Sequence, residues 1–387
     1  MKIAAFHSGL DIRRGSSLAF LEILKVIKGL GNEVHVHSFN INDWFRTQFT
    51  EASIPVNSID FHPATPFGVN MILTNNRRAR RAFGGLLDTF GSMDAAYLHG
   101  NLWTPHFLPM LRMPTVYYCD EPPRHYYEPD LVNTKLSKRV GKTLGSISRR
   151  IDKAADRKAV VTAVRIVTNS NYTRSYIKDV YGVKATAIYS GVDHERFCPD
   201  DGVAKEDMVA SIGALYPLKG HDLIIRSLGT IDPAKRPRLI IVGKGDQGAD
   251  LTSLARREGV TMEILTEIDH SQLIDIYRRA KLTLIAHIGE PFGLVAVESM
   301  SCGTPVVAVG EAGLLETVTD ETGILTSRKA GSFATAVSRI LDDDEQRRSM
   351  GRLGREWVKE TFDWNNTGAQ ILNELGTAVR DYNEGGP

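Results

Sequence analysis

The chain has 387 residues, 42% of them apolar, and a formal net charge of +1 at pH 7. This length exceeds one ordinary core and predicts two domains, while the balanced charge excludes a protein with a broad basic surface for nucleic acid. Three separated cysteines, none in a CxxC pair, argue against a disulfide framework or a structural zinc site. No apolar run has the length of a membrane span, and the opening residues MKIAAFHSG are typical of a strand, not a signal peptide, so we expect a cytoplasmic protein.

Strand-like and helix-like segments alternate along the amino-terminal half. We predict helices at 16–30, 77–90 and 172–181, and strands at 2–7, 33–39, 59–62, 95–99, 115–119, 165–169 and 185–189. Alternation of this kind predicts an open parallel sheet with helices on both faces.

A polar stretch without periodicity, residues 189–203, separates this half from the next. Beyond it the alternation restarts, with predicted strands at 208–215, 238–242, 261–265 and 323–326, and helices at 221–228, 250–258, 271–280, 331–341, 345–361 and 369–383. We therefore predict two doubly wound α/β domains, 1–198 and 199–365. A helical tail, 366–387, is expected to pack back on the first domain.

The stretch from Leu282 to Val309 has the pattern of a βαβ unit, because two short apolar runs flank a helix-length segment. The proline after Glu290 disfavours helical angles, so the helix is expected to begin near Phe292 or Gly293. The first amides of that helix, at Gly293 and Leu294, would attract phosphate or carboxylate groups.

Four glycine-bearing loops of the second half follow predicted strands, at 213–220, 243–248, 287–294 and 310–313. In open α/β sheets ligands bind outside the carboxyl ends of the strands, and glycine lets the backbone approach a ligand closely. Lys219, just before a helix, could meet a phosphate as a point charge. The alternative for Lys219 is a solvated lysine in a turn.

Two glutamates of this region, Glu290 and Glu298, are too far apart for an acid/base pair. Eight helical residues rise about 12 Å, whereas glycosidase carboxylate pairs lie about 5 to 9.5 Å apart. The two side chains could instead hold different parts of one elongated ligand, such as a sugar nucleotide. The alternative places Glu290 in an exposed loop and Glu298 on a helix surface.

A rival interpretation comes from the loop GKGDQG at Gly243, which matches G-x-G-x-x-G and has Glu263 downstream. This pattern is typical of a dinucleotide site. However, the loop follows the second strand of its domain, whereas the dinucleotide fingerprint usually follows the first.

The segment EPFGLVAVE, with the following SMSCGTPVVA, resembles the E-x7-E signature of retaining, nucleotide-sugar-dependent glycosyltransferases of family 4. That family has the GT-B fold, in which two Rossmann-like domains face each other across a cleft. Further matches cover essentially the whole chain, at the Gly15 loop, HGN at His99, SGVDHERF at 190–197, SIGALYPLKG at Ser211, VGKGDQG at Val242 and AG-x-x-E at 312–316.

The resemblance implies that the second domain binds the donor. It assigns the ribose to Glu298, the sugar hydroxyls to Glu290, and the diphosphate to Lys219 with the amides at the helix start. It places catalysis on Glu290, Lys219 and His99, with His99 near the transferred sugar and the acceptor. The implied donor contacts are Gly15, Ser16, Gly213, Lys219, Gly243, Glu267, Ile268, Glu290, Phe292, Gly293, Leu294 and Glu298, of which Glu267 and Ile268 lie at the base and Gly15 and Ser16 close on the phosphates.

The same resemblance implies a reaction that retains the anomeric configuration by front-face attack, with neither a metal nor another cofactor. We expect a sugar to move from a UDP- or GDP-hexose to a hydroxyl of a saccharide or lipid-linked acceptor, in the synthesis of cell-surface glycans or glycolipids. Two alternatives stay open, a sugar-nucleotide epimerase or hydrolase of the same fold, and a catalytically reduced subunit that binds a membrane surface.

Three positions depart from the family pattern. Ala214 stands where the family commonly has arginine, Ala286-His287 replaces Pro-Ser, and Ser16 replaces the second glycine of the amino-terminal loop. The diphosphate therefore lacks one expected cation. Candidates to replace it are Arg13, Arg14 and Lys244.

A basic segment from Lys135 to Lys158 contains nine lysines or arginines and two aspartates. Apolar residues recur in it every three or four positions, at Leu136, Val140, Leu144, Ile147 and Ile151. This pattern predicts an amphipathic helix that contacts an anionic membrane, and the alternative is a helix packing that stripe into the core. A second basic cluster lies in the same half, at Arg77, Arg78, Arg80 and Arg81.

Overall fold

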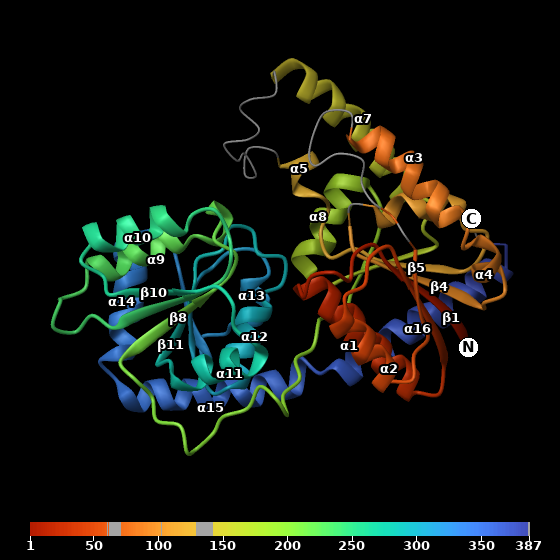
Figure 1. Ribbon diagram of the computed structural model, residues 1–387. Coiled ribbons are helices and arrows are strands. Elements are labelled where there is room, and N and C mark those ends of the chain that lie inside the picture. Colours follow the sequence, from red (N-terminus) through yellow and green to blue (C-terminus); the bar gives the residue numbers. More distant parts are fainter. Residues whose placement is uncertain (60, 62–70, 102, 129–141, 386–387) are drawn as a thin grey trace. The chain divides into compact units, whose positions relative to one another are not determined.

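The computed structural model describes residues 1–59, 61, 71–101, 103–128 and 142–385 (Figure 1). The chain divides into two compact units. Unit 1 comprises Met1–Tyr189 and Trp364–Pro387, and unit 2 comprises Ser190–Asp363.

The chain passes from unit 1 to unit 2 after Tyr189, whereas the predicted domain boundary was after residue 198. Residues 190–198 join unit 2 because Val192 pairs with Asp363 in an isolated bridge, and the Ser301 hydroxyl donates to the Phe197 carbonyl (2.5 Å). The second change falls after Asp363, so the carboxyl-terminal helix belongs entirely to unit 1.

Unit 1 is built on a parallel sheet with the strand order β3-β2-β1-β4-β5-β6-β7. Its strands are β1 (Lys2–His7), β2 (Glu33–Ser38), β3 (Val56–Ser58), β4 (Ala95–His99), β5 (Thr115–Tyr118), β6 (Arg165–Thr168) and β7 (Thr186–Ala187). The central strands are apolar and buried, as expected for a sheet covered by helices on both faces.

The helical segments of unit 1 cover this sheet (Figure 1). They are α1 (Gly15–Gly29), α2 (Asp43–Glu51), α3 (Met71–Gly84), α4 (Leu87–Gly91), the 3₁₀ segment η1 (Thr104–Met110), α5 (Arg124–Tyr127), α7 (Lys142–Val160), α8 (Asn171–Tyr181) and α16 (Trp364–Asn383). Helix α16 approaches α1 closely at Gly368, where a Cβ atom would lie 2.5 Å from Val26 Cγ1. Arg165 of β6 also bonds Glu374 (2.5 Å) and Asp381 (3.0 Å) of α16.

Some predicted boundaries in unit 1 were wrong. The predicted helix 77–90 is two helices, α3 and α4, because Gly85 interrupts it. The strand predicted at 59–62 lies earlier, at Val56–Ser58, and residues 60 and 62 lie outside the described part. Only Thr186–Ala187 of the strand predicted at 185–189 pairs with a neighbour.

Unit 2 contains a parallel sheet with the strand order β10-β9-β8-β11-β12-β13. Its strands are β8 (Met208–Ile212), β9 (Arg238–Val242), β10 (Met262–Leu265), β11 (Leu282–Ile285), β12 (Val306–Val309) and β13 (Gly323–Thr326). Its helical segments are η2 (Pro217–Lys219), α9 (His221–Gly229), α10 (Gly248–Arg257), α11 (His270–Arg279), α12 (Leu294–Ser301), α13 (Leu314–Thr317), α14 (Ala330–Leu341) and α15 (Asp344–Thr361). The predicted βαβ unit is β11-α12-β12, with β11 and β12 parallel.

In each sheet, the order in which successive strands are added changes from one side of the first strand to the other at a single point. In unit 1 this point lies between β1 and β4, and in unit 2 between β8 and β11. Loops at such a switch point leave on opposite faces and open a crevice, which is where doubly wound folds bind ligands. The switch points therefore locate the candidate site within each unit.

Candidate active site

The glycine loops of unit 2 pack directly on one another. A Cβ atom at Gly243 would lie 1.9 Å from the Gly213 carbonyl oxygen, and one at Gly220 would lie 2.1 Å from that of Ala286. The Gly313 amide donates to the Glu290 carbonyl (2.9 Å). Glycine is needed at these positions for contact between backbones. The loops after β8, β9, β11 and β12 thus form one continuous surface.

Replacing Gly243 with alanine is expected to lower the melting temperature by about 4–10 °C, because the new methyl group collides with a backbone carbonyl that cannot rotate away. Differential scanning calorimetry measures this change. Gly248→Ala is the matched control, since a Cβ there meets nothing closer than Leu215 Cδ1 at 3.7 Å. Equal melting temperatures for the two variants would contradict the steric argument.

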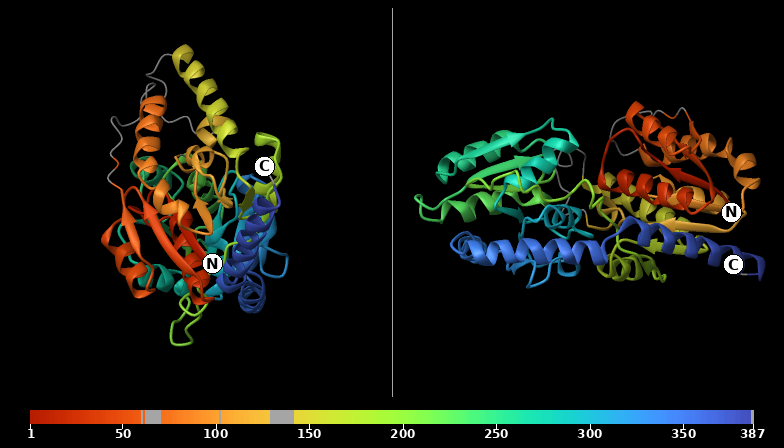
Figure 2. Two further views of the ribbon diagram at one scale, coloured as in Figure 1. Left: turned by 90° about the vertical axis from the view of Figure 1, so that its right-hand side faces the viewer. Right: turned by 90° about the horizontal axis from the view of Figure 1, so that it is seen from below.

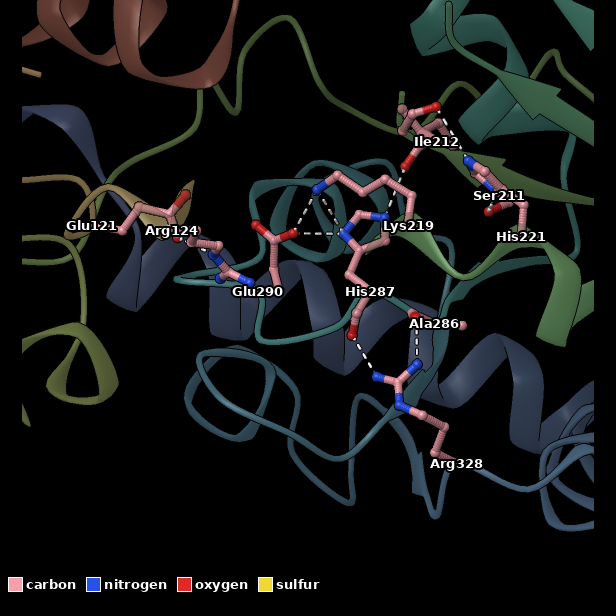
Figure 3. A network of polar contacts seen from close by, with 11 residues as sticks. Glu121, Arg124, Ser211, Ile212, Lys219, His221, Ala286, His287, Glu290 and Arg328 are labelled. Carbon is pink, nitrogen blue, oxygen red and sulfur yellow. Dashed lines mark hydrogen bonds and ion pairs between the residues drawn. The ribbon is translucent and has the colours of Figure 1, made fainter. Parts of the chain in front are cut away.

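Lys219, His287 and Glu290 meet at the switch point of unit 2 (Figure 3). Lys219 Nζ lies 2.8 Å from Glu290 Oε2, and His287 Nδ1 lies 2.6 Å from the same oxygen. Lys219 Nζ is also 3.3 Å from His287 Nδ1. Lys219 comes from the loop after β8 and the other two from the loop after β11, so the fold joins residues that are 71 positions apart. The structure brings together Lys219 and Glu290, which the sequence proposed separately.

Electrostatics keep Glu290 ionised. Burial alone would raise the pKa of its carboxyl, but the charge of Lys219 and the hydrogen bond from His287 bring that pKa well below its ordinary value. The pKa of His287 is lowered by burial and by Lys219. The 2.6 Å contact requires a proton on Nδ1, which is donated to the carboxylate. Nε2 lies 3.2 Å from the Ile212 carbonyl and gains a hydrogen bond there only when the ring is doubly protonated.

Arg328 holds the loop that carries this cluster. Its guanidinium donates to the carbonyls of Ala286 and His287, both at 2.7 Å (Figure 3). It also pairs with Glu311 at 2.7 Å. Sequence reasoning missed Arg328. Its position just after β13 was the available signal, because the carboxyl ends of parallel strands share one edge of the sheet.

Glu298 lies on α12 and has a different partner from Glu290. The Tyr277 hydroxyl donates to Glu298 Oε2 (2.8 Å), and burial raises the pKa of this carboxyl to about 7. The two glutamates therefore differ in acidity, because the pKa of Glu290 is lowered and that of Glu298 is raised. Tyr277 is a second residue that the sequence did not indicate.

Glu298→Gln is expected to stabilise the protein at pH 8 but not at pH 5. The folded-state pKa of about 7 lies above the ordinary value of 4.5, so wild-type stability is lost as the pH rises through that window. The loss amounts to about 1–3 kcal/mol, and the isosteric amide does not suffer it. Melting temperatures of both proteins at pH 5 and pH 8 test this expectation. If the melting temperatures of wild type and Glu298→Gln differed by the same amount at pH 5 and pH 8, the expectation would be contradicted.

The start of α12 lies at Leu294, one position after the latest predicted start. Its cap, Gly293, has φ +105°, and a Cβ there would lie 2.8 Å from Leu314 Cδ2, so glycine is required. The first amides of an α-helix have no acceptor within the helix and can bind an anion. The side chain of Phe292, a predicted donor contact, is instead buried against Phe362 with ring centroids 5.5 Å apart.

The predicted base-binding residues lie after β10. Glu267 is exposed and pairs with Lys244 (2.9 Å), and Ile268 packs against the apolar cluster beneath the loop. Lys244, a candidate to replace the missing arginine, therefore already has a partner. The same holds for a second candidate, Arg13. Arg13 lies over the Trp44 ring at 4.6 Å from its centroid.

The glycines of the GKGDQG loop serve contacts inside the protein. Besides Gly243, a Cβ at Gly245 would lie 2.5 Å from the Leu215 carbonyl oxygen. Glu263 lies within β10, with its carboxylate 3.9 Å from Arg238, and not at the carboxyl end of the strand. These contacts explain the glycine pattern without a dinucleotide.

In unit 1 the predicted residues Ser16 and His99 converge on the carboxylate of Asp120, which the sequence analysis did not indicate. His99 Nε2 lies 3.1 Å from Asp120 Oδ1, and the Ser16 hydroxyl donates to Asp120 Oδ2 (2.5 Å). Gly15 begins α1, so Ser16 lies in its first turn. His7 Nε2 lies 3.2 Å from the Ser16 oxygen and completes the group.

The basic segment forms α7 from Lys142 onward, and its residues 135–141 lie outside the described part. The predicted apolar stripe does not form the buried face where it can be followed. Ile151 is 43% exposed, whereas Asp156 is fully buried and accepts hydrogen bonds from Tyr127 (2.8 Å) and Tyr181 (2.7 Å). The buried face of the helix is therefore the one that carries Asp156, where both tyrosine hydroxyls donate to the carboxylate oxygen Oδ2.

Helices α3 and α7 lie on the same side of unit 1, drawn in orange and yellow in Figures 1 and 2. Among the side chains that the structure describes on these helices, the exposed basic ones are Arg77, Arg78, Arg80, Arg81, Arg150, Arg157 and Lys158. Within the described ranges, no three His, Cys, Asp or Glu side chains gather as metal ligands, and no helix is long and apolar enough to cross a membrane.

Two family models match consecutive parts of the chain. Glycosyltransferase Family 4 matches residues 14–196, and Glycosyl transferases group 1 matches residues 200–357. The chain therefore belongs to glycosyltransferase family 4, and the predicted GT-B architecture is confirmed.

Relatives with curated names include the D-inositol 3-phosphate glycosyltransferase 2 of Catenulispora acidiphila, 30% identical over 248 residues (57% of this chain, 58% of that protein). The D-inositol 3-phosphate glycosyltransferase of Kribbella flavida is 32% identical over 250 residues (58% of this chain, 59% of that protein). The match thus spans little more than half the length of these relatives.

Solved structures with this fold include sucrose-phosphate synthase from Thermosynechococcus elongatus, with a TM-score of 0.79, 20% identity and 98% coverage of both chains. Another is Anabaena Alr3699/HepE in complex with UDP and glucose, with a TM-score of 0.75, 20% identity, and coverage of 97% of this chain and 100% of that one. At such identities the likeness concerns the fold alone.

Proposed function

We propose that the protein is a retaining, metal-independent glycosyltransferase that moves a hexose from a UDP- or GDP-hexose to a hydroxyl of a saccharide or lipid-linked acceptor. The observation that carries the proposal is the pair of Lys219 and Glu290, 2.8 Å apart beside the start of α12. It places a cation suited to a leaving diphosphate next to a carboxylate suited to sugar hydroxyls.

The proposed donor lies along the loops at the carboxyl edge of the unit 2 sheet. Glu298 accepts from the ribose hydroxyls and Glu290 from the sugar hydroxyls. The amides of Gly293 and Leu294, with Lys219, receive the diphosphate. The loop of Glu267 and Ile268 contacts the base largely through its backbone. The names of the relatives support a sugar nucleotide as the donor, since the Anabaena structure holds UDP and glucose.

The reaction breaks the bond between the anomeric carbon and the phosphate oxygen. The electron pair stays on the diphosphate, whose added charge is stabilised by Lys219 and the start of α12. The acceptor oxygen attacks from the same face, and its proton passes to the leaving phosphate. Glu290 orients the sugar and forms no covalent bond, because its carboxylate is already held by Lys219 and His287.

Thermal-shift measurements with UDP-, GDP- and ADP-sugars and with NAD test the donor class. We expect a rise in melting temperature with a UDP- or GDP-sugar and none with NAD. Stabilisation by NAD alone would overturn the proposal. Release of free nucleoside diphosphate at the same rate with and without acceptors would favour a hydrolase of the same fold.

We further propose that unit 1 contacts an anionic membrane through the basic segment Lys135–Lys158, which would set the reaction at the cytoplasmic face of the membrane. Exposed basic side chains on α3 and α7, together with the exposed Ile151, support this contact. Glutamate at Arg150, Arg157 and Lys158 is expected to weaken co-sedimentation with phosphatidylglycerol vesicles about tenfold or more. Arg256→Glu with Arg257→Glu, on α10, is the control, and equal binding by both sets would contradict the proposal.

A further inference from the structure

The histidine predicted to act on the substrate is enclosed by the protein. The His99 side chain is 0% exposed, its Nδ1 lies 2.9 Å from the Tyr97 hydroxyl, and its ring stacks on Tyr118 with centroids 4.2 Å apart. Its other nitrogen, Nε2, contacts Asp120. A ring held in this way cannot touch a reactant without leaving its site.

Asp120 and Ser16 are partly exposed, whereas His7 and His99 are buried. Asp120 follows β5 at the carboxyl edge of the sheet, and its side chain is 19% exposed. Its backbone is held by Asn169, whose amide nitrogen donates to the Asp120 carbonyl (3.1 Å). The carboxylate therefore has a fixed position and remains accessible.

Two hydrogen-bond donors, the Ser16 hydroxyl and the His99 ring, are oriented toward this carboxylate by further hydrogen bonds. The Gly9 amide donates to His7 Nδ1 (3.1 Å), so the proton of neutral His7 is on Nε2 and points at the Ser16 oxygen. Ser16 must then direct its own hydrogen at Asp120 Oδ2. Burial, followed by the nearby His99, lowers the pKa of His7 to about 3, so His7 stays neutral in this role.

The second donor is the His99 ring. Because the Tyr97 hydroxyl can donate to Nδ1, the Nε2–H of His99 is free to donate to Asp120 Oδ1. Burial alone would raise the pKa of Asp120, but His99 and Ser16 bring it below its ordinary value. Asp120 is thus an ionised acceptor with one donor on each oxygen and lone pairs left for a third.

We propose that Asp120, and not His99, is the unit 1 side chain that contacts the reactants, by accepting a hydrogen bond from the attacking hydroxyl of the acceptor. His99, Ser16 and His7 are positioning residues that act through it. The inference rests on the proposed glycosyl transfer and specifies the acceptor group that meets Asp120, a neutral hydroxyl. A phosphate would be repelled by the carboxylate. The proton of the hydroxyl still passes to the leaving phosphate, because a carboxylate with a lowered pKa is a weak base.

This assignment changes the expected role of Ser16. Resemblance to the family places Ser16 on the donor phosphates, but its hydrogen is already committed to Asp120. Ser16 then affects the acceptor more than the donor. Measuring the effect of a Ser16 substitution on acceptor kinetics and on donor affinity therefore distinguishes a role at the acceptor from a role at the donor phosphates.

The test uses the full chain with UDP-glucose as donor and D-inositol 3-phosphate, with a panel of other polyols, as acceptors. Asp120→Asn is expected to lower kcat/KM for the acceptor about 10–100-fold, since a charged hydrogen bond is lost. The affinity for UDP, measured by calorimetry, should change less than about twofold. Asp94→Asn is the matched control, because its carboxylate accepts from the Lys2 amide (2.7 Å) at the opposite edge of the same sheet.

A double-mutant cycle tests the positioning role. His99→Gln alone is expected to lower kcat/KM about 3–30-fold, and it should cost nothing further when Asp120 is already asparagine. A full additional loss in the double variant, or an Asp120→Asn variant as active as Asp94→Asn, would overturn the inference. If Asp120→Asn does not fold, Ser16→Ala replaces it, with a smaller loss toward the acceptor and unchanged UDP affinity expected.

Failure of the proposed function gives a different result. In that case the wild-type protein would bind neither UDP nor GDP and would release neither from a UDP- or GDP-hexose, and the inference would fall with it. Transfer by the wild-type protein together with an unaffected Asp120→Asn variant would reject the inference alone.

Discussion

Lys219→Ala is expected to lower kcat for sugar transfer by about 10²–10³-fold while the donor KM changes less than tenfold. The ammonium group interacts more strongly with the diphosphate as the glycosidic bond breaks, because negative charge grows on the leaving oxygen. With alanine at position 214, this lysine carries more of that charge stabilisation than it would beside an arginine. Steady-state rates of UDP or GDP release in the presence of acceptor measure the effect.

Lys235→Ala is the matched control for this variant. Lys235 pairs with Asp342 at 2.9 Å, close to the 2.8 Å of Lys219 and Glu290, but it precedes β9, whereas the glycine loops follow the carboxyl ends of the strands. Its exposed ion pair contributes little to stability. We expect activity within about twofold of wild type. A Lys219→Ala enzyme with a similarly small loss would refute the role of this cation in leaving-group stabilisation.

Glu290→Gln is expected to lower kcat/KM by about 10²-fold. The amide keeps the shape of the side chain but removes the charge, so hydrogen bonds to the sugar hydroxyls weaken. It also removes the group that raises the pKa of His287, so that pKa should fall further below its ordinary value. Rate measurements and NMR titration of His287 give two independent readouts.

Glu263→Gln serves as the control for Glu290. Glu263 lies on β10 of the same sheet, and the dinucleotide interpretation assigns the ribose to it. Activity and sugar-nucleotide affinity close to wild type are expected for this variant. A large loss at Glu263 with none at Glu290 would instead support the dinucleotide site.

The order of strands and helices in both halves was predictable because buried parallel strands are apolar runs and the intervening helices have a 3.6-residue period. Sequence spacing also separated Glu290 from Glu298, and the structure gives them different partners, Lys219 with His287 and Tyr277. The order of the elements and the separation of the two glutamates both follow from spacings between residues of one continuous segment. Such distances are set by local geometry.

The helix α7 shows where sequence reasoning reached its limit. One of the two interpretations of its apolar spacing packed that stripe into the core, but Ile151 is 43% exposed and Asp156 is buried. That outcome depends on Tyr127 and Tyr181, which lie on other helices and donate hydrogen bonds to Asp156 Oδ2. A hydrogen-bond partner on another element has no signature in the spacing of the helix itself.

The sequence by itself determined the class of fold, the family and the loops that hold the candidate donor site, because periodicity and short motifs are local properties. Only the tertiary structure decided which side chains meet in those loops. It joined Lys219 and His287 to Glu290, fixed the loop of His287 and Glu290 with Arg328, and enclosed His99 while leaving Asp120 accessible. These contacts link loops after different strands, so their geometry and protonation depend on sheet order and burial, which spacing along the chain does not contain.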